Sequence, residues 1–189
     1  MKNLISLASV NGLKYLPSYI SEAEENALLR AIDQEKWMTG LRRRVQHYGY
    51  EYDYKARTVL ASMYLGPLPN WVSDLATRLC REGVMPDTPD QVIVNEYLPG
   101  QGISRHVDGI SCFGPVIGSL SLGSQCIMNL YSPENLLVEL ALEGRSLVTF
   151  SGEARYLWAH AIPARQSDVI QSRKVLRQRR VSLTFRKII

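Results

Sequence analysis

The sequence predicts a mainly β domain with flanking helices, and three observations support this. Short apolar segments separated by glycine-containing turns fill the C-terminal half, with no helical pattern between them. Both helical patterns lie in the N-terminal half. The 189 residues, of which 46% are hydrophobic, suffice for one domain with a substantial core. Several short strands at this spacing are typical of an antiparallel sandwich or barrel.

The first expected elements are a short strand and two helices. An extended segment over residues 12–20 leads to Ser21, a helix N-cap with Glu24 at the capping-box spacing. An apolar stripe then continues toward Trp37. A second helix over residues 71–80 has its large apolar side chains on one face. We expect these helices to pack on the outside of a sheet.

Between the helices, residues 43–54 (RRVQHYGYEYDY) alternate tyrosine with other residues. The pattern predicts a strand or hairpin with one aromatic face, formed by Tyr48, Tyr50, Tyr52 and Tyr54. Such rings either pack on the core beneath them or line a pocket for a flat base, and the pattern leaves both interpretations open. We expect His47 to be a packing or surface histidine rather than a metal ligand.

The remaining strands are expected at 92–94, 116–122, 126–131, 136–140, 146–150, 156–161 and 180–186. In the last strand Val181, Leu183 and Phe185 share one face, and Arg180, Ser182, Thr184 and Arg186 share the other. The two arginines therefore point either into solvent or into a cleft, where a buried guanidinium requires an anionic partner.

The segment VIVNEYLPGQGISRHVD (residues 92–108) runs from an apolar strand through a Pro-Gly turn to His106 and Asp108. On extended backbone these two side chains share a face, and with a second histidine they would form a two-histidine, one-carboxylate iron site. A match to this short pattern is expected about 0.3 times by chance in such a composition. Taken alone, a strand-end histidine beside a solvated aspartate is the simpler interpretation.

The net charge of +4 is unevenly distributed. No acidic residue follows Asp168, whereas seven lysines and arginines lie in residues 173–187. A second basic cluster consists of Arg42, Arg43 and Arg44. Basic clusters near aromatic residues suit a nucleic acid, although a solvated arginine-rich face is the commoner explanation.

The cysteines and the apolar runs indicate where the protein is located. The chain has three cysteines and no CxxC spacing, which argues against a disulfide framework and against a zinc ribbon, so we expect a reducing cytoplasm. No apolar run has membrane-spanning length, and the N-terminus has no clear signal-peptide pattern. We therefore expect a cytoplasmic protein that does not enter a membrane.

Four motifs, taken in order, resemble the AlkB family of iron(II)- and 2-oxoglutarate-dependent dioxygenases. They are Asn95-x-Tyr97, His106-x-Asp108, His160 and Arg180-x5-Arg186. The resemblance extends from about residue 12 to residue 187, and the segments RRVQHYGYEYDY, SLSLGS and SGEARYLWAH support it. Within the family, the chain is most similar to the tRNA-modifying AlkB homologues.

The resemblance implies a double-stranded β-helix (jelly roll) with N-terminal helices packed on one sheet. Residues 1–189 would form a single domain, with the helices and a substrate lid in 1–90 and the catalytic core in 91–189. The catalytic iron(II) would be held by His106, Asp108 and His160, leaving positions for 2-oxoglutarate and O2. The residues expected to bind 2-oxoglutarate are Asn95, Tyr97, Arg180 and Arg186.

The implied reaction converts 2-oxoglutarate to succinate and carbon dioxide while a nearby C–H bond is hydroxylated; an N-methyl group would then leave as formaldehyde. The substrate would be an alkylated base in DNA or RNA, either single-stranded or flipped out of a duplex. Arg43 and Arg44 would contact phosphates, Tyr48 would lie in the lid, and the His106 ring would stack on the base. Alternatives are a tRNA wobble-uridine side-chain hydroxylase, a protein demethylase, and a non-catalytic binding module that retains the fold.

Two positions depart from the family pattern. Ile110 stands where DNA-repair members have an acidic residue that recognises the exocyclic amine of the base, which argues against repair of 1-methyladenine and 3-methylcytosine. Ser182 stands where some members have asparagine. The tRNA-modifying relatives also carry RNA-binding and methyltransferase domains, which 189 residues cannot accommodate. Either an RNA-binding or methyltransferase partner supplies these functions or the substrate differs, and we expect the protein itself to be a monomer.

Overall fold

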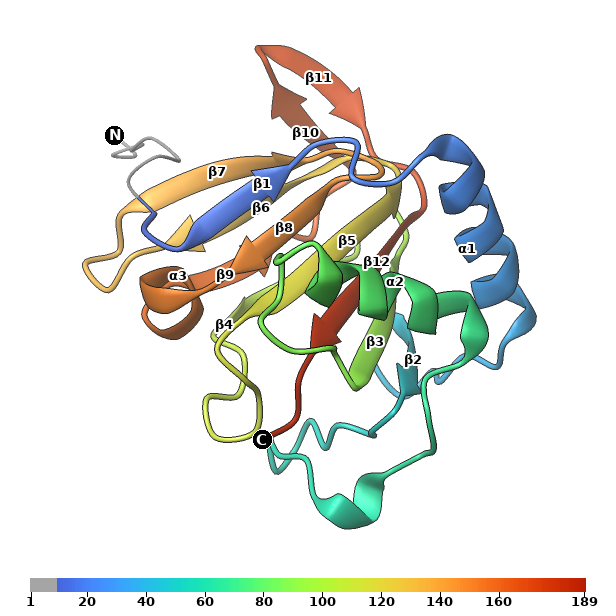
Figure 1. Cartoon of the computed structure of the whole chain (residues 1–189). Helices are drawn as coiled ribbons and strands as arrows, with labels where there is room; N and C mark the ends of the chain where they lie inside the picture. Colours follow the sequence, from blue (N-terminus) through green and yellow to red (C-terminus); the bar gives the residue numbers. More distant parts are fainter. Residues whose placement is uncertain (1–9) are drawn as a thin grey trace.

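The computed structural model describes residues 10–189 and consists mainly of two β-sheets with helices on one side (Figure 1). The six-stranded sheet has the order β1 (Leu13–Leu16), β8 (Leu147–Phe150), β5 (Ile117–Gly123), β12 (Arg180–Arg186), β3 (Gln91–Tyr97) and β2 (Arg44–Tyr48). The four-stranded sheet has the order β4 (Ile103–His106), β9 (Ala159–Ile162), β6 (Cys126–Tyr131) and β7 (Leu137–Leu142). A separate hairpin pairs β10 (Ser167–Ile170) with β11 (Arg173–Leu176).

Helices α1 (Glu22–Gln34) and α2 (Asn70–Arg81) pack on the outer face of the six-stranded sheet, as predicted (Figure 1). The Ser21 side chain accepts from the Glu24 backbone N–H, while the Glu24 carboxylate accepts from the Ser21 backbone N–H, which completes the capping box. The core cluster on this face contains residues from both helices and from β3, β5, β8 and β12. Burial of these apolar side chains holds the two helices against the outer face of the sheet.

The second core cluster lies between the two sheets, where residues of β6, β7 and β9 meet Tyr97, Val148 and Phe150 of the larger sheet. Strand β12 therefore separates two environments. Its apolar side chains face the helices, and its polar side chains face the space between the sheets. The arginines of this strand point into a cleft rather than into solvent.

Two local predictions differ from the structure, and one element was missed. The strand expected over residues 43–54 ends at Tyr48, because Gly49 has φ +77° and a Cβ there would lie 1.8 Å from the Asp90 carbonyl oxygen. The strand expected at 156–161 begins only at Ala159, after the short helix α3 (Gly152–Tyr156). The hairpin β10–β11 was not predicted. Strands β1 and β2 bring segments of the first 90 residues into the larger sheet.

None of the helices within residues 10–189 is long and apolar enough to cross a membrane.

A short 3₁₀ helix, η2 (Ala61–Met63), lies in the connection between β2 and α2. All three cysteines are free.

Candidate active site

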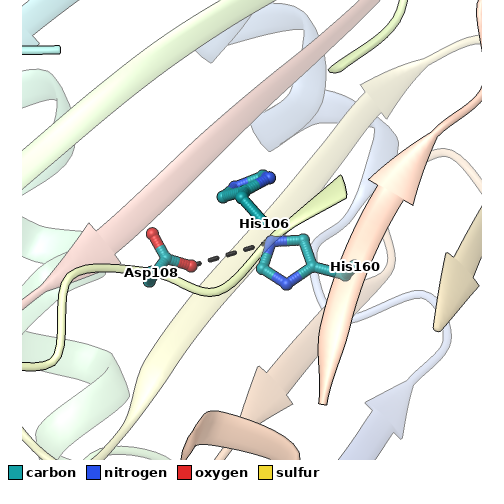
Figure 2. A group of neighbouring side chains, drawn as sticks. All are labelled: His106, Asp108 and His160. Atoms are coloured by element: carbon teal, nitrogen blue, oxygen red, sulfur yellow. Dashed lines mark ion pairs between the residues drawn. The ribbon is translucent and has the colours of Figure 1, made fainter. Parts of the chain in front are cut away.

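His106, Asp108 and His160 converge, with one potential ligand atom from each lying within 4.8 Å of the others (Figure 2). The Nε2 atom of His160 is 3.7 Å from Oδ2 of Asp108. The two imidazole centroids are 4.4 Å apart, and the His160 ring also stacks on Phe150 at 5.0 Å. Two imidazoles and one carboxylate form the donor set of a facial-triad iron site.

Sheet pairing explains how residues so far apart in sequence meet. Strands β4 and β9 are antiparallel neighbours, and His106 lies directly opposite His160 in their register. Asp108 follows β4 by two residues and lines the same cavity as the two rings. The turn after β3 therefore positions the first two candidate ligands, and strand pairing supplies the third.

The protonation states suit metal binding. Nδ1 of His106 lies 2.8 Å from the Ser104 carbonyl oxygen, and because a carbonyl can only accept, Nδ1 is the donor, which leaves Nε2 as the ring nitrogen that could coordinate a metal. Burial and, next, the charge of His106 lower the pKa of His160 to about 4, while Asp108 acts in the opposite direction. Burial alone would raise the pKa of Asp108, but the Arg186 guanidinium and the two imidazoles hold it well below its usual range.

The loop that carries Asp108 is held in place by Arg155 of α3, which no sequence pattern indicated. This guanidinium is buried and donates to the backbone carbonyls of Asp108 at 3.0 Å and Gly109 at 2.8 Å. It also reaches the carbonyls of Phe113 and Gly114, each at 3.4 Å. Arg155 is therefore a positioning residue for the loop that carries the candidate ligand Asp108.

The triad opens into a cavity of about 510 Å³ between the sheets. The polar face of β12 lines it, and Arg180 is only 3% exposed there. Nη2 of Arg180 donates to Ser121 Oγ at 2.7 Å, but Nε and Nη1 have no hydrogen-bond partner in the part of the chain that the structure describes. A buried guanidinium with orphaned donors requires an anion, and a carboxylate of 2-oxoglutarate fits this requirement.

The other residues predicted to bind 2-oxoglutarate lie in the same cavity with partners of their own. Arg186 donates from Nη2 to Asp108 Oδ1 at 2.5 Å and from Nη1 to Gln91 Oε1 at 3.3 Å, while its Nε is unpartnered. Asn95 accepts at Oδ1 from Arg43 Nε at 2.8 Å. The ring of Tyr97 lies under the Arg180 guanidinium, with 5.3 Å from Cζ to the ring centroid.

The structure separates the three residues predicted to contact the substrate. Arg43 lines the cavity, where it lies over the rings of Tyr54 and Tyr97. Arg44 and Tyr48 do not line it. In β2 the side chains alternate, so these two residues point to the helix side of the sheet.

The Tyr48 ring packs edge-on against Trp71, with centroids 5.1 Å apart. Arg44 is likewise engaged outside the cavity, in a bidentate ion pair with Glu96 at 2.6 and 2.7 Å. The strand that carries both residues ends before Gly49, where the chain turns at φ +77°.

Three residues after Gly49 line the cavity: Tyr52, Tyr54 and Arg57. The sequence pattern placed the two tyrosines on an aromatic face with either a packing or a pocket-lining role, whereas Arg57 was not predicted as a site residue. Tyr52 and Tyr54 fold back over the cavity, where their rings meet edge-on at 5.1 Å. The dense tyrosine pattern indicated the segment but not which rings would enter. His47 is a packing histidine, as expected, since Nε2 lies 3.1 Å from the Tyr54 hydroxyl.

Comparisons with known proteins agree with this geometry. The family model of the 2OG-Fe(II) oxygenase superfamily matches residues 12–186. The mouse tRNA (carboxymethyluridine(34)-5-O)-methyltransferase ALKBH8 is 36% identical over 99% of this chain, which spans 32% of that protein. The Arabidopsis thaliana alkylated DNA repair protein ALKBH8 homolog is 38% identical over 95% of this chain, which spans 59% of that protein.

Two solved structures have the same fold. OsALKBH1 superposes with a TM-score of 0.64 at 18% identity, covering 93% of this chain and 96% of its own. A prolyl-4-hydroxylase from Pseudomonas putida gives a TM-score of 0.59 at 12% identity, covering 96% of this chain and 95% of its own. The predicted jelly-roll fold with N-terminal helices on one sheet is confirmed.

Proposed function

Because the chain belongs to the 2OG-Fe(II) oxygenase superfamily, with AlkB homologues among its relatives, we propose that it hydroxylates or oxidatively demethylates an alkylated base in nucleic acid. The observation that carries the proposal is the convergence of His106, Asp108 and His160 in the cavity of the buried Arg180 guanidinium, whose Nε and Nη1 have no partner among residues 10–189. Such a site fits iron(II) and a carboxylate cosubstrate at the same time.

In this proposal the imidazoles of His106 and His160 and the carboxylate of Asp108 hold iron(II). When bound, iron(II) and 2-oxoglutarate supply the oxidising chemistry, in which O2 is consumed, 2-oxoglutarate becomes succinate and carbon dioxide, and a C–H bond becomes C–OH. Arg180 holds one carboxylate of the cosubstrate, and Ser121 keeps the guanidinium oriented. Arg186 orients the Asp108 carboxylate and presents its free Nε to the same space.

The apolar part of the cavity excludes water from the reacting atoms. Ile117, Met128, Phe150 and Ile162 line the space beside the polar face of β12. Low local polarity strengthens the ion pairs that orient the cosubstrate. Burial also keeps the His160 imidazole neutral, so its lone pair remains available to the metal at neutral pH.

The proposed substrate is a nucleic acid base because the relatives that match most of this chain are named for tRNA and DNA. Arg42 and Arg43 lie at the cavity, where they would meet phosphates, and Tyr52 and Tyr54 offer faces for stacking. Ile110 is 55% exposed and accepts no hydrogen bond from a base amine. This favours hydroxylation of an alkyl side chain on uridine over repair of 1-methyladenine or 3-methylcytosine.

We further propose a cytoplasmic monomer that works with a separate RNA-binding or methyltransferase partner. The free cysteines support a reducing compartment. The alternative of a non-catalytic binding module leaves the intact trio of ligands without a role. A protein demethylase would need to bind a peptide at the same cavity, beside Arg42 and Arg43.

The test is mass spectrometry of RNA and DNA nucleosides before and after incubation with the iron-loaded enzyme, 2-oxoglutarate and O2. A hydroxylated uridine without formaldehyde would identify the side-chain reaction, and formaldehyde would identify demethylation. Succinate should form in proportion to the product, and the His160→Ala variant should form neither. Unchanged nucleosides in all pools, together with succinate formation on a methylated peptide, would refute the nucleic acid substrate.

A further inference from the structure

Arg57 lies beside the candidate iron site and has no assigned role. Its side chain lines the cavity at the solvent-exposed edge. Nη2 donates to the backbone carbonyl of Val107 at 3.1 Å, so the guanidinium lies against the residue between His106 and Asp108. Among residues 10–189 it forms no ion pair with a carboxylate. The guanidinium also contacts the Tyr52 side chain, so part of its fork of five donors is engaged and the rest remains available at the cavity edge.

The loop that presents Arg57 is well defined. The Asp53 carboxylate accepts from the backbone N–H groups of Lys55 and Ala56, and Asp53 pairs with Thr58 across the turn. Tyr52 anchors the loop on Phe113, with ring centroids 5.6 Å apart. Arg57 itself has φ +55°, a conformation that the rest of the turn imposes. The guanidinium is therefore placed by the loop rather than free to sample the whole surface.

The charges around the cavity are strongly unequal. Its lining contains five arginines and a single carboxylate: Arg42, Arg43, Arg57, Arg180, Arg186 and Asp108. The carboxylate is already bonded to Arg186, and the two negative charges of the cosubstrate would be offset by Arg180 and by the bound iron(II). The positive charges at the edge, including Arg57, then remain without an anion. A substrate with a negative group near its reacting carbon would complete this arrangement.

We propose that Arg57 binds an anionic oxygen group of the target nucleotide and so selects the substrate. The group is a carboxylate on the base substituent or a phosphate next to the base, both of which fit the guanidinium fork. The inference rests on the proposed function and deepens it. It also explains the direction of selectivity, since 1-methyladenine and 3-methylcytosine are cations and would meet uncompensated arginines beside the neutral Ile110.

The test uses the iron-loaded protein with 2-oxoglutarate under anaerobic conditions, so that binding is measured without turnover. The RNA probes are anticodon stem-loops with carboxymethyluridine at the wobble position, with its neutral methyl ester, or with an uncharged methylphosphonate beside an unmodified uridine. Arg57→Asn removes the charge while retaining a residue that tolerates positive φ. Lys55→Ala is the matched control, because it removes one positive charge from the same loop outside the cavity lining.

If Arg57 binds the carboxylate, the wild type should bind the acid about fivefold more tightly than the ester, and Arg57→Asn should lose this preference. If it binds the phosphate, the methylphosphonate should weaken the wild type about fivefold and leave Arg57→Asn unaffected. Binding by Arg57→Asn equal to that of Lys55→Ala on every probe would overturn the proposal. So would a parallel loss of iron binding and of uncoupled decarboxylation, because Arg57 would then only position Val107.

Absence of turnover by the wild type on all nucleic acids would refute the proposed function. The binding comparison would still decide the role of Arg57, because it does not depend on turnover.

Discussion

The two faces of strand β12 differ in what they contribute to the molecule. Val181, Leu183 and Phe185 face the helices and are at most 1% exposed. Arg180, Ser182, Thr184 and Arg186 face the cavity. The first face stabilises the fold through apolar burial, whereas the second contains buried guanidinium donors without partners. Adjacent residues on one strand should therefore affect either stability or chemistry, but not both.

The largest effect is expected on the cavity side, for His160→Ala. Loss of one of three ligands should abolish iron binding and lower turnover by at least about 10³-fold, while the far-ultraviolet circular dichroism spectrum is retained. Iron content per folded protein and succinate release provide the measurement. His47→Gln is the control, since this histidine is also packed but bonds Tyr54 instead of the triad. Wild-type iron content in His160→Ala would remove His160 from the site.

The complementary change on the helix side is Leu183→Ala. Leu183 is fully buried, so the lost methyl groups and the remaining cavity should lower the free energy of unfolding by about 2–5 kcal/mol. Turnover per folded molecule should remain near the wild-type value below the melting temperature. Urea unfolding and iron-dependent activity on the same sample measure the two effects. A large loss of turnover in fully folded protein would show that the faces are not independent.

This contrast also shows what the sequence could predict. The alternation in β12 predicted both faces correctly. Successive side chains of a strand point to opposite faces, so placing one residue in the core places all the others. The candidate ligands His106, Asp108 and His160 followed from the order of motifs, and β4–β9 pairing brings them together. What alternation could not predict was the point at which a strand stops. After the break at Gly49, Tyr52 and Tyr54 line the cavity, whereas Tyr48 before it does not.

Arg155 shows a different limit. Its partners are backbone carbonyls, which every residue possesses, so no pattern of residue types identifies them. Arg44 shows a third limit. It belongs to a basic cluster that suggests phosphate contacts, yet its charge is engaged by a buried glutamate from β3. Charge clusters in a sequence predict a surface only when their acidic partners are known.

A smaller effect is expected for Arg180→Met, which isolates cosubstrate binding. The variant keeps the length of the side chain and removes a buried charge, so the free energy of unfolding without ligand should be unchanged or higher. The 2-oxoglutarate concentration for half-maximal succinate formation should rise about 30-fold, or about 2 kcal/mol. A given concentration of 2-oxoglutarate should raise the melting temperature of the wild type more than that of the variant. Arg186 allows no such separation, because it also bonds Asp108.

The smallest effect concerns Glu96, a charged residue on the helix side of β3. Burial alone would raise its pKa, but hydrogen bonds from Arg44 and Arg179 lower it below the ordinary value. A folded-state pKa below the unfolded one contributes stability that is complete above the unfolded pKa of about 4.3 and is lost as the pH falls through the folded value.

Glu96→Gln should therefore lower the free energy of unfolding by about 1–2 kcal/mol at pH 7, since both arginines are partly exposed. The difference from the wild type should shrink as the pH falls below about 4.3, which urea unfolding at a series of pH values measures. Turnover at neutral pH should not change, because Glu96 does not line the cavity. A constant difference across the acid range would mean that packing of the side chain, rather than its charge, stabilises this edge of the sheet.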